Sequence, residues 1–411
     1  MASVIKDAWT SERIVKQFEA ENAPLGRLEA VKGTMIGTQA QVPIWNNRSG
    51  AYTSTGAAGG SLNPAQAQQV NQATFSLVYS WFQIALEASA LVQATASGSQ
   101  AIIAAKDLEV EGAVENTKHN MVRQLVTNGD GKVAATGTSG GANVVLPLTA
   151  AASEGAAYGY SALIRNWLFP GQTVDVGTTA DTDALVTAST ISAVSLSATA
   201  PTITIGSAID ATAGTHFVYI PNPNSATAAN SEMNGLRNIA ATTGALGGLN
   251  PATAGQEFWQ AASRDTATTV FSLDLILGLQ RAVLQNSGKN YTDLWMGFKQ
   301  RQNLYALLQN QVRFNGDGGL SAGSVDSVQW NNNKIDAFAD ILETDVFMLT
   351  LSDLVRVTGG LGKPQWASDL QGANNGQIWS AGTTQFVDGL VYPLNIGCQR
   401  RNTQAAATAL Q

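Results

Sequence analysis

A glycine-rich stretch at residues 359–364 is the segment whose composition comes nearest to phosphate chemistry. A phosphate-binding loop needs a glycine five places before Gly362, and a serine or threonine after the lysine to hold Mg²⁺. This sequence has Val357 and Pro364 at those two positions. Because proline supplies neither a hydroxyl nor a backbone N–H donor, the stretch is predicted to be a plain loop.

Two groups of acidic residues have types and spacing that could do chemistry. Residues 128–131 read Asn-Gly-Asp-Gly, which resembles the start of a calcium loop, but the further carboxylates and the glutamate at position twelve are missing. Asp181 and Asp183 could pair as acids, but they lie in a segment rich in glycine and threonine with no other candidate group beside them. We predict a turn and a solvated loop, and no metal site.

The single cysteine and the two histidines are the remaining candidates for nucleophilic or acid–base chemistry. Cys398 has no local catalytic signature and is predicted to be a buried structural thiol. His216 is predicted to lie in a strand, in the core or at an edge, and His119 on the exposed side of a charged helix. The basic pair at 400–401 is predicted to be solvated or salt-bridged. We therefore predict no catalytic residues, no cofactor and no enzyme activity.

The composition points to a protein whose surface is covered by other molecules. Only 13% of the 411 residues are charged, about half of the typical ~25%, and interface cores are depleted in charge. The net charge of −7 argues against a dedicated nucleic-acid binder, which carries a basic patch. The N-terminus has no apolar signal region, and no apolar run approaches the ~18 residues of a membrane span. A soluble protein made in the cytosol is expected.

The first 80 residues are predicted to form extensions rather than a compact core. Residues 1–40 resemble an arm with a short amphipathic helix, either docked on its own domain or crossing to a neighbouring subunit. Residues 41–80 contain a single charge, Arg48, and two strand-like pieces around a glycine-rich tip. Because an isolated hairpin is marginal in water, this excursion is expected to lie on a partner. Its candidate subunit-interface residues are Trp45, Arg48 and Tyr52.

Residues 100–127 give the clearest helical pattern. Val114 and Met121 belong to a narrow apolar stripe at helical spacing, and they are the candidate packing residues of this helix. The other faces carry charged side chains, among them Arg123. The helix is predicted to lie across a domain and to stop at residues 128–131.

Residues 165–222 are predicted to form a small all-β unit, sandwich or barrel, because β-branched segments alternate there with turn residues. The pattern after residue 222 is mixed. Helices are predicted at 257–264, 272–285 and 298–309; strands are predicted at 292–297, 344–355 and 384–396, with a hairpin over 328–338. A polar tail is predicted from Gln399.

Several short motifs, taken in their order, give the sequence a family resemblance. They read Glu-Met-Asn-Gly-Leu-Arg at 232–237, a glycine-rich turn at 244–248, Gln-Val-Arg-Phe at 311–314 and Leu-Asn-Ile-Gly-Cys-Gln-Arg-Arg-Asn at 394–402. With the arm, the excursion and the long helix before them, they resemble the major capsid proteins of tailed bacteriophages. The resemblance implies an α+β protein with the Hong Kong 97-type capsid fold.

The family resemblance implies a division of the chain. It comprises an N-terminal arm (1–40), an extended loop (41–80), a peripheral domain (81–164) with a spine helix (100–127), a β-rich insertion (165–222), an axial domain with remaining peripheral elements (223–383) and a C-terminal peripheral strand (384–411). The implied function is structural: many copies assemble, as hexamers and pentamers, into an icosahedral shell around double-stranded DNA. Few basic residues mean few phosphate contacts, so DNA is expected to be enclosed without being specifically bound.

The implied partners are further copies of the chain, portal, scaffolding and decoration proteins, and no membrane. The implied location is the virion, after assembly in the host cytoplasm. Two alternatives stay open on the sequence: an encapsulin-like nanocompartment, which shares the fold, and a β-rich carbohydrate-active enzyme or binding module, suggested by nine tryptophans and many asparagines and threonines.

Overall fold

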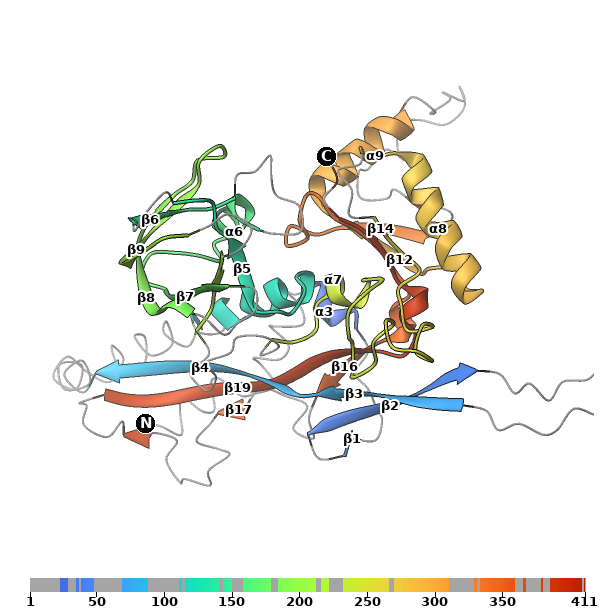
Figure 1. Ribbon diagram of the computed structural model, residues 1–411, viewed down its shortest axis with the longest axis horizontal. Helices are drawn as coiled ribbons and strands as arrows, with labels where there is room; N and C mark the ends of the chain where they lie inside the picture. The colour runs from blue at the N-terminus through green and yellow to red at the C-terminus, as the bar shows by residue number, and fades with distance from the viewer. Residues whose placement is uncertain are drawn as a thin grey trace, which may run out of the picture.

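The computed structural model describes residues 23–28, 35–36, 38–47, 69–87, 111–112, 115–117, 119–139, 143–149, 158–178, 184–211, 216–221, 232–265, 270–309, 329–330, 333–358, 365–366, 378–379, 385–408 and 410. Helices and strands are mixed along the chain, so the fold is of the α+β class. Two lobes stand on one side of a long β layer (Figure 1).

The long layer is built around strand β19 (Gln385–Cys398). Strand β4 (Val78–Glu87) pairs antiparallel with it from Leu394 to Gln385. The opposite edge of β19 is occupied in turn by three shorter strands, β18 (Ile378–Trp379), β17 (Gln365–Trp366) and β16 (Leu354–Thr358). The predicted strand at 384–396 is therefore present, and it continues through Gly389 and Pro393.

A β-ribbon continues the layer at one end (Figure 1). Strand β2 (Gln39–Asn47) pairs antiparallel with β3 (Gln69–Ser76), and the short β1 (Met35–Ile36) flanks β2. The two strand-like pieces predicted within 41–80 are thus present, and they pair with each other to form the root of the ribbon. Residues 48–68, with the glycine-rich tip, lie outside the described residues. Strand β4 follows β3 after one residue, Leu77, so the ribbon leads directly into the long layer.

One lobe is a closed β-barrel. Its strand order is β5-β10-β7-β8-β9-β6. The bridge between Thr136 and Leu148, with Gly137 N donating to the Pro147 carbonyl at 2.8 Å, joins the two ends of the sheet. The strands are β5 (Lys132–Ala135), β6 (Asn143–Pro147), β7 (Thr173–Thr178), β8 (Ala184–Ser195), β9 (Thr202–Ile209) and β10 (His216–Tyr219). Helix α6 (Tyr160–Ile164) lies between β6 and β7 along the chain.

The barrel begins earlier than the predicted β unit of 165–222. Strands β5 and β6 come from the segment before residue 165 and are needed to close the sheet. They are short, and glycine, alanine and threonine dominate the chain around them, so no period-2 alternation marks them in the sequence. The interior is filled by buried aliphatic side chains, among them Val174, Val176, Ile191, Ile203, Ile205 and Val218.

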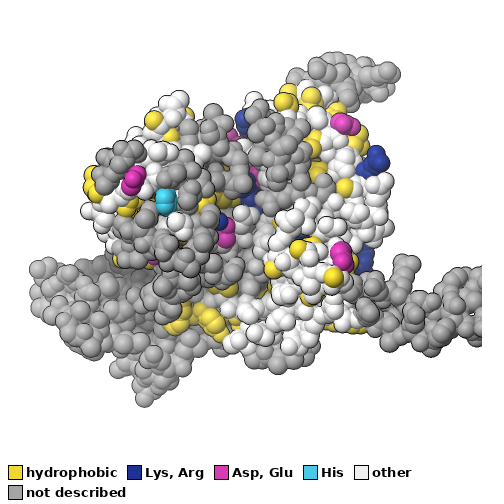
Figure 2. Space-filling model, viewed as in Figure 1, with side chains coloured by type: hydrophobic (Ala, Val, Ile, Leu, Met, Phe, Trp, Pro, Cys, Tyr) yellow, Lys and Arg dark blue, Asp and Glu magenta, His cyan; other side chains and the backbone are white. Residues whose placement is uncertain are grey.

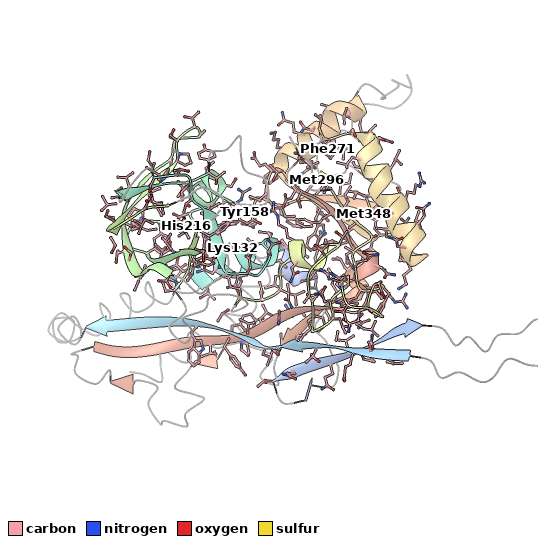
Figure 3. The ribbon with its side chains drawn as sticks, in the orientation of Figure 1. Lys132, Tyr158, His216, Phe271, Met296 and Met348 are labelled. Carbon is pink, nitrogen blue, oxygen red and sulfur yellow. The ribbon has the colours of Figure 1, made fainter. Side chains whose placement is uncertain are left out.

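The other lobe, called the helical lobe below, is a mixed sheet covered on one face by two helices. Its strands, in order, are β11 (Ser263–Asp265), β20 (Ala405–Ala407), β15 (Val346–Leu349), β12 (Asp293–Met296), β14 (Asn333–Ala337) and β13 (Gln329–Trp330). Met296 and Met348 face helix α8 (Leu273–Ser287) and helix α9 (Phe298–Gln309) in one apolar cluster with Phe271 (Figure 3). Ser272 caps α8 by accepting from Leu275 N, as its position before the apolar run favours.

Two predictions for this lobe are wrong. Residues 257–264 were expected to be helical, but they form turns followed by β11, because buried Trp259 donates from its indole nitrogen to the Leu246 carbonyl at 2.9 Å and fixes the turn. The expected polar tail after Gln399 is buried. It crosses from the long layer into this sheet as β20, where its fully buried alanines lie between β11 and β15.

Short helical segments fill the space between the lobes and the layer (Figure 1). Residues 111–112, 115–117 and 119–126 are helical, which covers the C-terminal part of the predicted helix at 100–127. Helix α3 (Ala23–Gly26) and the following Leu28 are packed on their own chain, so this part of the predicted arm is docked. Helix α7 (Leu236–Ile239) lies nearby, and 3-10 turns occur at Leu351–Asp353 and Arg401–Thr403.

Candidate functional site

The residues singled out from the sequence fall partly outside the described structure. The backbone of Trp45 lies in β2 opposite Val70, whereas Arg48 and Tyr52, the other candidate interface residues, lie outside the described residues. Of the two candidate packing residues, Val114 also lies outside them. Met121 is buried, with 1% of its surface exposed, against Leu125 and Val126 in the main core. The glycine-rich stretch 359–364 and the Asp181–Asp183 pair are likewise outside.

The root of the ribbon is fixed by one aromatic side chain. Phe75 on β3 is 1% exposed and lies against two glycines. A Cβ added to Gly247 would come within 3.0 Å of the ring, and a Cβ added to Gly397 would do the same. Thr74 N also donates to the Gly247 carbonyl at 2.8 Å. The glycine-rich turn and the C-terminal motif, both singled out in the sequence, therefore hold the ribbon to the body.

Asn395, in the C-terminal motif, connects three segments. Its side-chain nitrogen donates to the Ser76 carbonyl at 2.6 Å, and its side-chain oxygen accepts from Asn234 N at 2.9 Å. Asn234 returns a hydrogen bond from its own side chain to the Ile396 carbonyl at 3.0 Å. The end of β3, the 232–237 motif and β19 are thereby locked together. Buried amides are placed this way because unsatisfied polar groups are costly.

Arg123 differs from the prediction that placed it on a solvated helix face. Its side chain is 1% exposed and forms a two-pronged ion pair with Glu232, with the longer of the two contacts at 3.2 Å. The backbone of the 232–237 motif lies directly against the end of this helix, because a Cβ on Gly235 would lie 1.8 Å from the Thr127 carbonyl oxygen. The glycine and the ion pair together explain why this motif lies against the helix.

Arg237 and Asp345 form a fully buried bidentate pair between α7 and the helical lobe, at 2.7 and 2.8 Å. Burial opposes the charge of Arg237, but the Asp345 carboxylate outweighs it and raises the pKa of the guanidinium above its ordinary value. The guanidinium also lies 4.8 Å from the ring centre of Tyr158. Tyr158 itself lies on the side of the barrel that faces the other lobe (Figure 3). Burial raises the pKa of Tyr158, which stays a neutral phenol. This cluster joins both lobes.

Arg401 was predicted to be solvated or salt-bridged, and the structure shows that it is not solvated. The side chain is buried, and its guanidinium donates at 2.7 to 3.3 Å to the backbone carbonyls of Asn238, Ile239, Thr243, Gly244 and Trp259. Asn238 and Ile239 lie at the carbonyl end of α7, where a cation is favourable. Its neighbour Arg400 is exposed, so only one member of the pair is structural.

The thiol and the histidines are arranged as structural groups. Cys398 is fully buried, and burial raises the pKa of its thiol to about 12, so it is not a thiolate at neutral pH. His216 is buried in β10 and His119 is exposed beside Glu115, at 3.3 Å. In the described part of the chain no group of three or more histidine, cysteine or acidic side chains could hold a metal ion. Among the helices described, none is long and apolar enough to cross a membrane.

The surface itself is poor in charge and carries large apolar side chains. Figure 2 shows few basic or acidic side chains on the face it presents. Exposed apolar residues occur on β4 (Tyr79 and Trp81) and on the two helices of the helical lobe (Leu277 and Leu284 on α8, Phe298 and Tyr305 on α9). Val70, toward the outer end of the ribbon, is 53% exposed. These surfaces are candidates for contacts with other chains.

No family model and no curated protein matches the sequence. A solved structure is similar in fold. The capsid asymmetric unit of cyanophage A-1(L) matches with a TM-score of 0.52 and 11% identity, over 94% of this chain and 92% of that chain. The chain has the fold of a bacteriophage capsid protein. At this identity the likeness is one of fold, and it extends over nearly the whole capsid fold.

Two further solved structures are less similar to this chain. The capsid of a native GTA particle matches with a TM-score of 0.48 and 9% identity, over 94% of this chain and 90% of that chain. The holo-SrpI encapsulin complex from Synechococcus elongatus PCC 7942 matches with a TM-score of 0.43 and 7% identity, over 94% and 87%.

Proposed function

We propose that this chain is the major capsid protein of a tailed bacteriophage, and that many copies self-assemble into an icosahedral shell enclosing double-stranded DNA. The observation that carries the proposal is the capsid fold, matched over 94% of the chain. The low charge content supports it independently, because obligate interfaces of roughly 2,000–5,000 Å² are apolar. The role is structural and not catalytic.

Within this proposal the fold is of the Hong Kong 97 type, and the ribbon is the extended loop. Its root is fixed to the body through Phe75, while Val70 farther out is exposed. The loop lies on an adjacent subunit, with Trp45, Arg48 and Tyr52 as contact residues. A ribbon that carries one charge over 41–80 is suited to an apolar partner surface.

The helix at 100–127 is the spine of the peripheral domain, with Val114 and Met121 on its packing side. The helical lobe, which comes mostly from residues 223–383 with β20 added from the C-terminal segment, is the axial domain that surrounds the centres of hexamers and pentamers. Strand β19 belongs to the peripheral domain. The closed β-barrel is the insertion and faces outward, where neighbouring subunits and decoration proteins can reach it. Closure supports this exposed position, because a barrel has no free strand edges.

The proposed partners follow from this arrangement. They are other copies of the chain, a portal protein and scaffolding and decoration proteins, with DNA enclosed but not specifically bound. The negative net charge of −7 supports weak adhesion of DNA to the wall. Assembly takes place in the host cytoplasm, and the mature protein is found in the virion.

The test is production of the chain in bacteria, followed by sedimentation, electron microscopy and analysis of the contents of any particle. We expect closed particles of uniform size, with a scaffolding protein added if the chain alone forms only capsomers. Met121→Asp buries an unpaired carboxylate and is expected to abolish particles, whereas His119→Asp, on the exposed side of the same helix, is expected to leave them intact. A monomer under every condition contradicts the proposal. Particles that selectively enclose an enzyme encoded beside this gene favour the encapsulin alternative.

A further inference from the structure

Helix α8 exposes apolar side chains on the side that faces away from its own core. Its inner side packs through Ile276, Leu279 and Val283. On its outer side Leu277 is 51% exposed and Leu284 is 41% exposed. These two residues are seven positions apart and therefore lie on one face, two turns from each other. Val270, just before the helix, is 69% exposed.

Gly278 lies on the same outer face, in the middle of the helix. Glycine in a helix interior is unfavourable relative to alanine, so it usually has a packing reason. Two glycines outside helix interiors, Gly235 and Gly129, have such a packing reason, since an added Cβ would strike a backbone carbonyl at 1.8 and 2.2 Å. Gly278 has none within the described chain, because nothing lies within 4 Å of an added Cβ. The absent side chain leaves room for another molecule to approach the helix backbone.

The charges on this face are balanced. Asp274 and Arg281 are both exposed and, being seven positions apart, lie on the side that carries Leu277. The chain as a whole has a net charge of −7, so copies of it repel one another unless the surfaces that meet are balanced. A face with one carboxylate and one guanidinium offers each copy an opposite charge on both sides of an apolar centre.

We propose that this α8 face, made of Asp274, Leu277, Gly278, Arg281 and Leu284, contacts a second copy of this chain in the assembled particle. The inference rests on the proposed shell function and names one of the surfaces that builds the shell. Helix α9, which covers the same face of the sheet, also carries exposed apolar side chains, Phe298 and Tyr305.

The area of the α8 face indicates whether the contact can hold a free dimer or forms only in the assembled particle. A helix of 15 residues is about 22 Å long and about 10 Å wide, so it presents roughly 220 Å². A stable complex between two free proteins buries about 800 Å² on each partner. The α8 face is therefore too small to hold a dimer alone and acts within a lattice in which each copy makes several contacts at once.

The test compares three chains: the natural one, Gly278→Ala and Gly278→Gln. Both replacements are better helix formers than glycine, so neither should lower the urea midpoint of the soluble subunit. Alanine adds one methyl group and serves as the matched control, whereas the long glutamine side chain fills the space left for the neighbour. We expect particle yield to stay within twofold for Gly278→Ala and to fall at least tenfold for Gly278→Gln. A normal yield of Gly278→Gln particles overturns the inference.

A second measurement does not depend on disrupting the particle. Arg281→Cys places a thiol on the α8 face, while the natural Cys398 is buried and serves as the unlabelled internal reference. We expect a maleimide to label position 281 in the soluble subunit and at least tenfold more slowly in intact particles. Equal rates contradict the contact. If the natural chain forms no particles at all, the proposed function fails, and the inference fails with it; particles with an accessible α8 face refute the inference alone.

Discussion

At the scale of single residues, buried arginines hold distant parts of this chain together. Arg123 reaches Glu232, which is 109 positions away, and Arg237 reaches Asp345, which is 108 positions away. Arg27, which is only partly buried, adds an ion pair with Asp336. Hydrophobic periodicity could not predict these pairs, because it reports which face of an element is apolar and not which partner a charged side chain meets. The motifs at 232–237 and 394–402 did mark the right segments, although the role of Arg401 was misjudged.

Arg401 gives a direct test of this scale. Arg401→Lys keeps the charge but loses the planar fork of donors that serves several carbonyls at once. We expect the free energy of unfolding to fall by about 3 kcal/mol, since hydrogen bonds to charged groups contribute about 1.5–3 kcal/mol each. Urea unfolding of the soluble subunit measures it. Arg400→Lys, the exposed neighbour, is the control and should change little; equal effects of the two variants would show that the carbonyl contacts are unimportant.

The buried thiol of Cys398 is expected to make the free energy of unfolding depend on pH in the alkaline range. Its pKa is raised from 9.0 to about 12 in the folded chain, so the folded state keeps a proton that the unfolded state releases above pH 9. Stability from this group is complete below pH 9 and declines as the pH rises toward 12, by about 1.4 kcal/mol per pH unit. We expect Cys398→Ala to lose stability less steeply than the natural chain between pH 9 and 10.5. Parallel curves for the two proteins would exclude this role of the thiol.

At the scale of elements, the sequence predicted individual helices and strands better than the way in which the strands pair into sheets. The ribbon root, α8, α9, β12 and the hairpin of β13 and β14 lie where periodicity and turn residues placed them. Closure of the barrel through β5 and β6, and the crossing of the C-terminus into a second sheet as β20, were not foreseen. Both depend on short, small-residue strands that are specified by their neighbours and carry little signal of their own.

The turn that holds the ribbon can be tested with two adjacent glycines. Gly247 and Gly248 both have positive φ, +61° and +81°, but a Cβ added at Gly247 would meet Phe75 and Ala73, whereas one added at Gly248 would meet nothing within 4 Å. An alanine in this conformation costs about 1–2 kcal/mol at either position, and overpacking adds about 1–3 kcal/mol at Gly247. We expect Gly247→Ala to be the more destabilised and to expose the Thr74 amide to hydrogen exchange. Similar exchange in both variants would mean that the turn does not hold the ribbon.

The ribbon also bears on whether mature particles are covalently joined. Some shells of this fold are locked by bonds between a lysine on the extended loop and an asparagine of a neighbour, but residues 41–80 contain no lysine. Arg48 cannot act in its place because its guanidinium stays protonated. We expect boiled, reduced particles to give one band near 42.9 kDa on a denaturing gel. A ladder of oligomers that survives reductant would contradict noncovalent assembly.

At the scale of the whole molecule, the features agree with a subunit built to be covered. Only 13% of the residues are charged. Some of these charged residues are arginines that are buried in internal contacts. Apolar side chains remain exposed on the ribbon, β4, α8 and α9. The sequence predicted the capsid fold because its motifs keep their order along the chain. It could not predict which apolar side chains stay exposed, because exposure depends on the arrangement of the lobes and not on local pattern.

The most direct measurement of the central claim is an electron cryomicroscopy map of the purified, assembled chain. The proposed function requires a closed icosahedral shell in which the ribbon of each subunit lies on an adjacent copy, with Trp45 at or near the contact. A map showing such shells with the ribbon between subunits is the expected result. Purified chain that remains monomeric with and without scaffolding protein, or particles in which each ribbon folds back onto its own subunit, would contradict the account.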